Sequence, residues 1–128
     1  MGASEGTYKK VIELLGDLKG KRILDCGSGK GRLAKIIKEE GGKIFACDLN
    51  ARNFAFDIPF KKTDLNKTLD YPKNFFDKIV CVEIIEHLEN PFKLFREINK
   101  ILKKGGQLII TTPNIENIKS RLQFLFKV

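Results

Sequence analysis

Short apolar runs alternate along this chain with segments whose apolar residues recur at helical spacing, and few folds accommodate that alternation. The apolar runs predict strands over residues 21–26, 43–48, 60–64, 76–83 and 107–112. The helical spacing predicts helices around residues 11–15, 33–37, 91–104 and 115–125, and residues 50–58 fit one or two helical turns. The strands are apolar on both sides, which is typical of strands buried on both faces. This order predicts an α/β fold, a parallel sheet with helices on both faces.

The composition indicates one folded domain, residues 1–128. Hydrophobic residues make up 42% and charged residues 31% of the chain, as in ordinary globular proteins. No apolar run approaches the roughly 20 residues that a membrane-spanning helix needs, and no secretory signal is visible. The cysteines Cys26, Cys47 and Cys81 are odd in number and lack C-x-x-C spacing. They favour buried thiols in a reducing, cytoplasmic location.

The charge balance raises the question of an anionic partner. Lys and Arg number 24 against 16 Asp and Glu, which gives a formal net charge of +8. The excess is spread evenly along the chain, whereas a nucleic-acid surface usually concentrates its charge in a stripe or cluster. We therefore expect a lysine-rich solvated surface and no nucleic-acid partner.

A glycine-rich loop follows the first predicted strand, beyond whose carboxyl end parallel sheets bind ligands. It reads Asp25-Cys26-Gly27-Ser28-Gly29-Lys30-Gly31. Glycines let the backbone turn sharply and approach a ligand closely, and the next helix points free N–H groups toward that ligand. Arg32 stands where the dinucleotide fingerprint has its third glycine, and no register of the loop matches a P-loop. What remains is D-x-G-x-G-x-G after a strand.

This pattern resembles the first motif of class I S-adenosylmethionine-dependent methyltransferases. Asp48 closes the second predicted strand and Asp64-Leu65 closes the third, where that family has its other cofactor contacts. Residues 76–88 resemble the family's fourth-strand motif, and residues 101–114 resemble its helix and fifth strand. The resemblance covers roughly residues 8–126, and the motifs in combination are specific.

The resemblance implies a Rossmann-like three-layer α/β/α sandwich, with a mostly parallel sheet of about five strands in the order 3-2-1-4-5. It implies S-adenosylmethionine as the cofactor, whose ammonium the backbone near Gly27 and Glu83 would hold, with Asp25 assisting through water. The acid after the second strand would accept hydrogen bonds from the ribose hydroxyls. The implied cofactor-binding residues are Asp25, Gly27, Ser28, Gly29, Gly31, Asp48, Leu49, Asp64, Leu65 and Glu83.

His87, the only histidine, lies just beyond the fourth predicted strand. Over the predicted crevice it could act as a general base for a hydroxyl acceptor near neutral pH. The alternative, that His87 begins a helix and packs locally, remains open. Glu83-x-x-Glu86-His87 also resembles the E-x-x-E-H metal motif of some O-methyltransferases, including those of ubiquinone biosynthesis. Two carboxylates and an imidazole suit a divalent ion, but we expect no metal, since short motifs often match by accident.

Four functions compete for this domain. The leading one is methyl transfer to a small molecule, and the resemblance to ubiquinone-biosynthesis O-methyltransferases implies that the acceptor atom is an oxygen. The alternatives are a cofactor-binding module with little turnover and an RNA methyltransferase, which the lysine content suggests. A nicotinamide dehydrogenase is disfavoured by Arg32.

The family's sheet has seven strands, and the last two form an antiparallel hairpin beside strand five. Only five strands are predicted here, so the chain looks short at its C-terminus. We expect strand five to have one unpaired edge, next to an amphipathic helix over residues 115–125. Exposed edges pair readily with other chains, so this edge and helix predict either a homodimer or a cofactor-binding domain whose acceptor pocket lies open.

Overall fold

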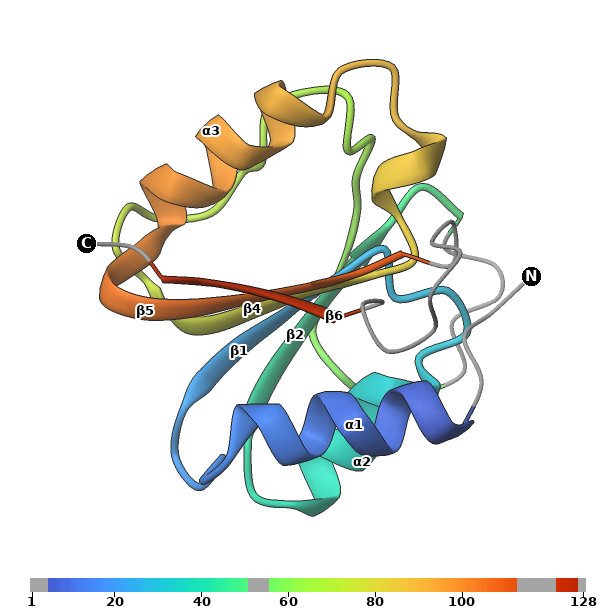
Figure 1. Ribbon diagram of the computed structural model, residues 1–128, viewed down its shortest axis with the longest axis vertical. Helices are drawn as coiled ribbons and strands as arrows, with labels where there is room; N and C mark the ends of the chain where they lie inside the picture. The colour runs from blue at the N-terminus through green and yellow to red at the C-terminus, as the bar shows by residue number, and fades with distance from the viewer. Residues whose placement is uncertain (1–4, 51–55, 113–121, 127–128) are drawn as a thin grey trace.

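A sheet of six strands forms the middle layer of the molecule (Figure 1). The computed structural model describes residues 5–50, 56–112 and, for their backbone only, 122–126. The strands lie in the order β3-β2-β1-β4-β5-β6, and neighbours from β3 to β5 are parallel. The predicted α/β class and the order 3-2-1-4-5 are therefore confirmed. The strands are β1 (Arg22–Cys26), β2 (Lys43–Asp48), β3 (Phe60–Lys62), β4 (Phe76–Val82), β5 (Leu102–Thr111) and β6 (Leu122–Phe126).

Helices cover both faces of this sheet, as predicted. The helices α1 (Glu5–Leu15) and α2 (Arg32–Glu39) lie on one face, and α3 (Pro91–Ile101) lies on the other (Figure 1). A short 3₁₀ helix, η2 (Ile85–His87), links β4 to α3. Within the described part of the chain, no helix is long and apolar enough to cross a membrane.

Alternation of side chains along the strands divides the core into two halves. Ile23 of β1 and Val80 of β4 pack with Val11 and Leu15 of α1 and Ile37 of α2. Leu24 of β1 and Ile79 of β4 point to the other face and pack beneath α3. The expectation of strands buried on both faces therefore holds for the central strands, which position the site.

Aromatic rings and thiols fill the half beneath α3. Phe76 is fully buried and makes edge contacts with the rings of Phe45, Phe75 and Tyr71, at centroid distances of 5.5, 5.0 and 5.1 Å. Edge-to-face pairs of this kind stabilise cores beyond their buried area. The three cysteines are free, buried and side by side, because Cys26 is in register with both Cys47 and Cys81. The prediction of buried free thiols is confirmed.

The helix α3 ends earlier than its sequence suggests. The helical spacing predicts a helix to residue 104, and the glycines that follow favour a left-handed cap. The helix instead ends at Ile101, and Leu102 is already extended and paired with Phe76. Leu102 is only 2% exposed. Burial of its side chain in the sheet is therefore favoured over extending α3 by one more residue. Gly105 does take the left-handed conformation, at φ +76°, but within β5 rather than as a helix cap.

The open edge expected for β5 is wrong, because β6 pairs with it antiparallel from Gln107↔Phe126 to Thr111↔Leu122. The helix expected over 115–125 is therefore wrong from residue 122 onward, and its residues 115–121 lie outside the described part of the chain. Residues 51–55, which belong to the segment 50–58 expected to form one or two helical turns, also lie outside it. The homodimer predicted through the open edge and that helix loses its structural basis. Backbone pairing explains the correction, since a strand beside β5 satisfies N–H and C=O groups that a helix would leave unpaired.

Glu97 provides a stability prediction. Its carboxylate is 5% exposed on α3 and accepts hydrogen bonds from the Leu69 N–H and the Lys100 Nζ, each at 3.0 Å. Replacing Glu97 by Ala leaves the buried Leu69 N–H without this hydrogen-bond acceptor, so we expect a loss of about 1–3 kcal/mol in the free energy of unfolding. Urea denaturation measures it, and Glu39→Ala on the exposed side of α2 is the matched control. An equal, small effect of both substitutions would contradict the prediction.

Candidate functional site

A cavity of about 350 Å³ opens beyond the carboxyl ends of β1, β2 and β4. Parallel sheets bind their ligands at this edge, and the volume is in the range of small-molecule sites. Of the predicted site residues, the structure brings together seven. They are Asp25, Gly27, Ser28, Gly29, Asp48, Glu83 and His87.

The glycine loop is held over the end of β2 by two backbone hydrogen bonds. The N–H groups of Gly27 and Ser28 both donate to the carbonyl of Cys47, at 2.8 and 3.0 Å. Gly27 has φ +78°, and a Cβ there would overlap the side chain of Ile84. Gly29 also has a positive φ, +57°, but a Cβ on it would meet nothing within 4 Å. Gly27 is therefore required for packing, whereas Gly29 borders open space into which a ligand can fit.

Asp48, at the end of β2, also holds the glycine loop in place. Its Oδ2 accepts the Gly29 N–H at 2.7 Å, and its Oδ1 accepts the Asn50 N–H at 3.0 Å. The carboxylate thus fixes the loop and still lines the cavity. Each carboxylate oxygen has a further lone pair for a ligand hydroxyl.

Asp25 is the most unusual group in the cavity wall. Its side chain is on β1 and 2% exposed, and its Oδ2 has no hydrogen-bond partner. Burial, followed by repulsion from Asp48, raises the pKa of Asp25 to about 7. A buried polar atom without a partner is costly, and a cationic ligand group would satisfy this carboxylate and favour its charged form.

Glu83 shapes the opposite wall. It takes a left-handed conformation, φ +56°, that is uncommon for a residue with a side chain. Its N–H donates to the carbonyl and the Oγ1 of Thr111, both at 3.0 Å, which holds the turn in place. Strained backbone of this kind is frequent at functional sites. The turn directs the chain into η2, so that Ile84 and His87 face the cavity.

Sequence reasoning missed several residues of the wall. Tyr8 of α1 lines the cavity, and burial, together with Asp25 and Glu83, raises its pKa against the opposing effect of Arg32. The spacing of Tyr8 with Val11 and Leu15 could have placed it on the inner side of α1. The other lining residues that were not predicted are Lys30, Arg32, Leu33, Val82 and Ile84.

Four predicted cofactor residues do not line this cavity. Gly31 caps α2 with φ +92°, and Leu49 is 60% exposed. Asp64 accepts the Asn66 N–H at 2.9 Å within its own loop, and Leu65 is buried in the core beneath α3. All four stay predictions for cofactor binding, with Asp64 and Leu65 expected at the adenine.

The E-x-x-E-H motif does not form a metal cluster here. His87 ends η2 and is exposed, with its Nε2 3.7 Å from Glu86 Oε2. Across residues 5–50, 56–112 and 122–126, no three His, Cys, Asp or Glu side chains are arranged to hold a metal ion.

Comparison with known proteins agrees with this geometry. The family model described as "Methyltransferase domain" matches residues 4–126. The ubiquinone biosynthesis O-methyltransferase of Vibrio cholerae is 31% identical over 122 residues, which cover 88% of this chain and 49% of the relative. The chain thus spans about half the length of the curated relatives it matches.

Solved structures show the same fold. An S-adenosylmethionine-dependent methyltransferase from Mesorhizobium loti superposes with a TM-score of 0.71 at 25% identity, over 84% of this chain and 52% of the other. The [4+2]-cyclase SpnF superposes with a TM-score of 0.72, also at 25% identity, over 84% of this chain and 44% of the other. The chain belongs to the methyltransferase domain family, whose cofactor is S-adenosylmethionine.

The cavity fits that cofactor. The unpartnered, buried Oδ2 of Asp25 suits its ammonium, and the open space beside Gly29 leaves room for its methionine end. The unpartnered Oγ of Ser28 adds a second polar atom without a protein contact. Three carboxylates, Asp25, Asp48 and Glu83, line the wall beside a ligand that carries a positive sulfonium.

Asp25 predicts a pH dependence of stability. Its pKa is higher in the folded protein than in the unfolded chain, so the folded state holds the proton more tightly, and the contribution of Asp25 to wild-type stability falls as pH rises from about 4 to about 7. Asp25→Asn cannot titrate, so its stability relative to wild type should rise over that range, by an amount on the order of 4 kcal/mol. Urea unfolding at several pH values measures this change.

The exposed carboxylate of Asp57 supplies the control. Asp57→Asn also removes one carboxylate, but an exposed one, and the change with pH should be much larger for Asp25→Asn than for Asp57→Asn. A change for Asp25→Asn no larger than that for Asp57→Asn would mean that the buried carboxyl does not titrate in this range.

Proposed function

We propose that this domain transfers a methyl group from S-adenosylmethionine to a small-molecule acceptor, at oxygen. The observation that carries the proposal is the cavity at the glycine loop, with the unpartnered Asp25 carboxyl in its wall. The oxygen acceptor is supported by the O-methyltransferases of ubiquinone biosynthesis among the relatives.

The residues of the chain bind S-adenosylmethionine and orient it for methyl transfer. When bound, the sulfonium supplies an already activated methyl group, so the protein's main contributions are orientation and exclusion of water. Asp25 pairs with the ammonium, and Asp48 accepts the ribose hydroxyls while it fixes Gly29. Glu83 and the adjoining turn close the cavity on the β4 side.

His87 is the candidate general base. A hydroxyl acceptor loses its proton as the new O–C bond forms, and an imidazole suits that task near neutral pH. His87 lines the cavity and is exposed, so it can reach an acceptor that enters from solvent. The small-molecule class is favoured over RNA because three carboxylates line this cavity against two cations, Lys30 and Arg32, which leaves no excess of positive charge to contact phosphates.

A second function is a cofactor-binding domain without methyl transfer. The structural match to SpnF favours keeping it, since that protein is named a cyclase and shares the fold. Fold alone does not define a reaction. We further propose a cytoplasmic location, which the three free thiols support.

Calorimetric titration with S-adenosylmethionine, S-adenosylhomocysteine and NAD tests the proposal. We expect both sulfur compounds to bind with similar enthalpy and NAD to give no heat, because the loop lacks the third dinucleotide glycine. Binding of NAD without S-adenosylhomocysteine would overturn the proposal. Methyl transfer from labelled S-adenosylmethionine to catechol-type hydroxyls then separates the two functions, since a binding domain shows no transfer.

Asp48→Ala tests the ribose contact. The substitution removes a charge-assisted acceptor, so we expect the dissociation constant for S-adenosylhomocysteine to rise about tenfold to a hundredfold. Asp57→Ala, an exposed carboxylate elsewhere, is the matched control. An unchanged constant in a folded Asp48→Ala variant, checked by circular dichroism, would remove Asp48 from the site.

A further inference from the structure

A second concavity lies at the opposite end of the sheet from the glycine loop. Its volume is about 390 Å³, and its wall comes from the beginnings of β4 and β5 and the end of α1. Four lysines line it, Lys21, Lys78, Lys103 and Lys104, with Asp77 as the one carboxylate among the lining residues. The amino ends of the strands are not where the family's cofactor is expected, so this feature is independent of the proposed function.

Lys78 is an unusual residue for its place in the fold. It lies on β4, in register with Ile23 on one side and Gln107 on the other, where lysine is disfavoured. Its Nζ donates to Gln107 Oε1 at 2.8 Å. Gln107 is only 7% exposed, and its Nε2 donates in turn to the Leu14 carbonyl at 2.9 Å. A buried amide therefore holds this ammonium in place at the wall of the concavity.

The carboxylates near the concavity do not balance its lysines. Asp77 accepts the Arg22 N–H at 2.8 Å and pairs with Lys103 at 3.1 Å, so it is already engaged. Burial and then the charge of Lys21 lower the pKa of Lys78, against the opposing effects of Asp77 and Asp17. Asp17 is exposed and bonded to the Lys19 N–H. The cations thus repel one another, and an anion between them would relieve that repulsion.

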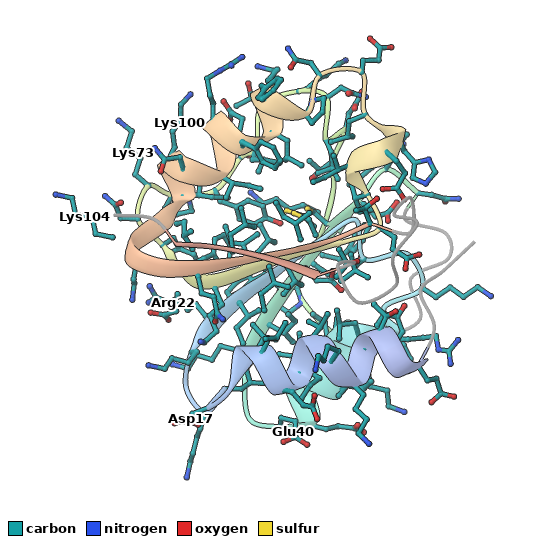
Figure 2. All side chains as sticks on the ribbon, viewed as in Figure 1. Asp17, Arg22, Glu40, Lys73, Lys100 and Lys104 are labelled. Atoms are coloured by element: carbon teal, nitrogen blue, oxygen red, sulfur yellow. The ribbon has the colours of Figure 1, made fainter. Side chains whose placement is uncertain are left out.

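The lysines of the concavity come together from three segments of the chain. Lys21 precedes β1, Lys78 lies on β4, and Lys103 and Lys104 lie near the start of β5. Lys104 is exposed at one side of the molecule (Figure 2) and can adjust to a ligand. The even spread of lysines along the sequence therefore hides a cluster in space.

We propose that this concavity binds a small ligand through its phosphate groups. A phosphate has several oxygens that accept charge-assisted hydrogen bonds from more than one lysine. The fixed ammonium of Lys78 lies in a hollow between β4, β5 and α1 rather than on a protruding ridge. A hollow favours a compact anion over a nucleic-acid backbone or a membrane surface, which need an extended contact.

Inorganic pyrophosphate is the probe, titrated into the full chain by calorimetry at constant ionic strength. We expect saturable binding, which Lys104→Met and Lys21→Met each weaken by about tenfold and Lys78→Met by more. Lys21 and Lys104 are exposed, so their variants remain informative if Lys78→Met fails to fold. Lys67→Met removes an exposed lysine from another loop and should bind pyrophosphate like wild type.

Several outcomes would overturn the proposal. One is heat no greater than that from an equal ionic strength of chloride, and another is an equal loss in Lys67→Met and Lys104→Met. Oligouridylate RNA or phosphatidylglycerol vesicles that bind while pyrophosphate does not would identify a macromolecular partner instead. Binding of S-adenosylhomocysteine should be unchanged in Lys104→Met, which separates this site from the glycine-loop cavity.

Discussion

The carbonyl of Cys47 accepts two backbone hydrogen bonds, from Gly27 and Ser28, and the candidate site depends on this anchor. It requires β1 and β2 to end at the same level, which their register provides by pairing Cys26 with Cys47. It also requires Gly27 to be left-handed, since the chain must turn back over β2 beneath Ile84. With the loop anchored, Asp48 can hold Gly29, and the space above the loop stays open.

Opposite charges gather at the two ends of the sheet. Carboxylates from β1, β2 and the end of β4 meet at the glycine loop, although the whole chain carries a net charge of +8. Lysines from the loop before β1 and from β4 and β5 meet at the other end. Because the strands are parallel, residues at equivalent strand ends come together whatever their separation in sequence. The two cavities therefore differ in the charge of their walls: three carboxylates and two cations at the glycine loop, and four lysines and one carboxylate at the other end.

Local patterns were least informative where two structures could satisfy them. Leu122 and Leu125 fit a helical stripe with Ile115 and Ile118, yet residues 122–126 form β6. Short apolar segments suit a helix or a strand, and the partner decides between them. Leu102 shows the same competition, because its place beside Phe76 ends α3 before the glycines do. Strand β3 is shorter than predicted and ends at Lys62.

The sequence by itself determined the central strands of the parallel sheet and the position of the glycine loop, because periodicity and turn residues act over a few neighbours. The strand order came only from the resemblance to class I S-adenosylmethionine-dependent methyltransferases. The sequence also predicted Asp25 and Asp48 as residues of the candidate site, since both stand at strand ends beside the loop. The tertiary structure alone decided that Tyr8 and Arg32 complete the wall, that Asp25 is buried without a partner, and that β6 covers β5. It also gathered Lys21, Lys78 and Lys104 into one hollow. These features depend on contacts between segments far apart in the chain, and burial and electrostatic coupling exist only once those segments are packed.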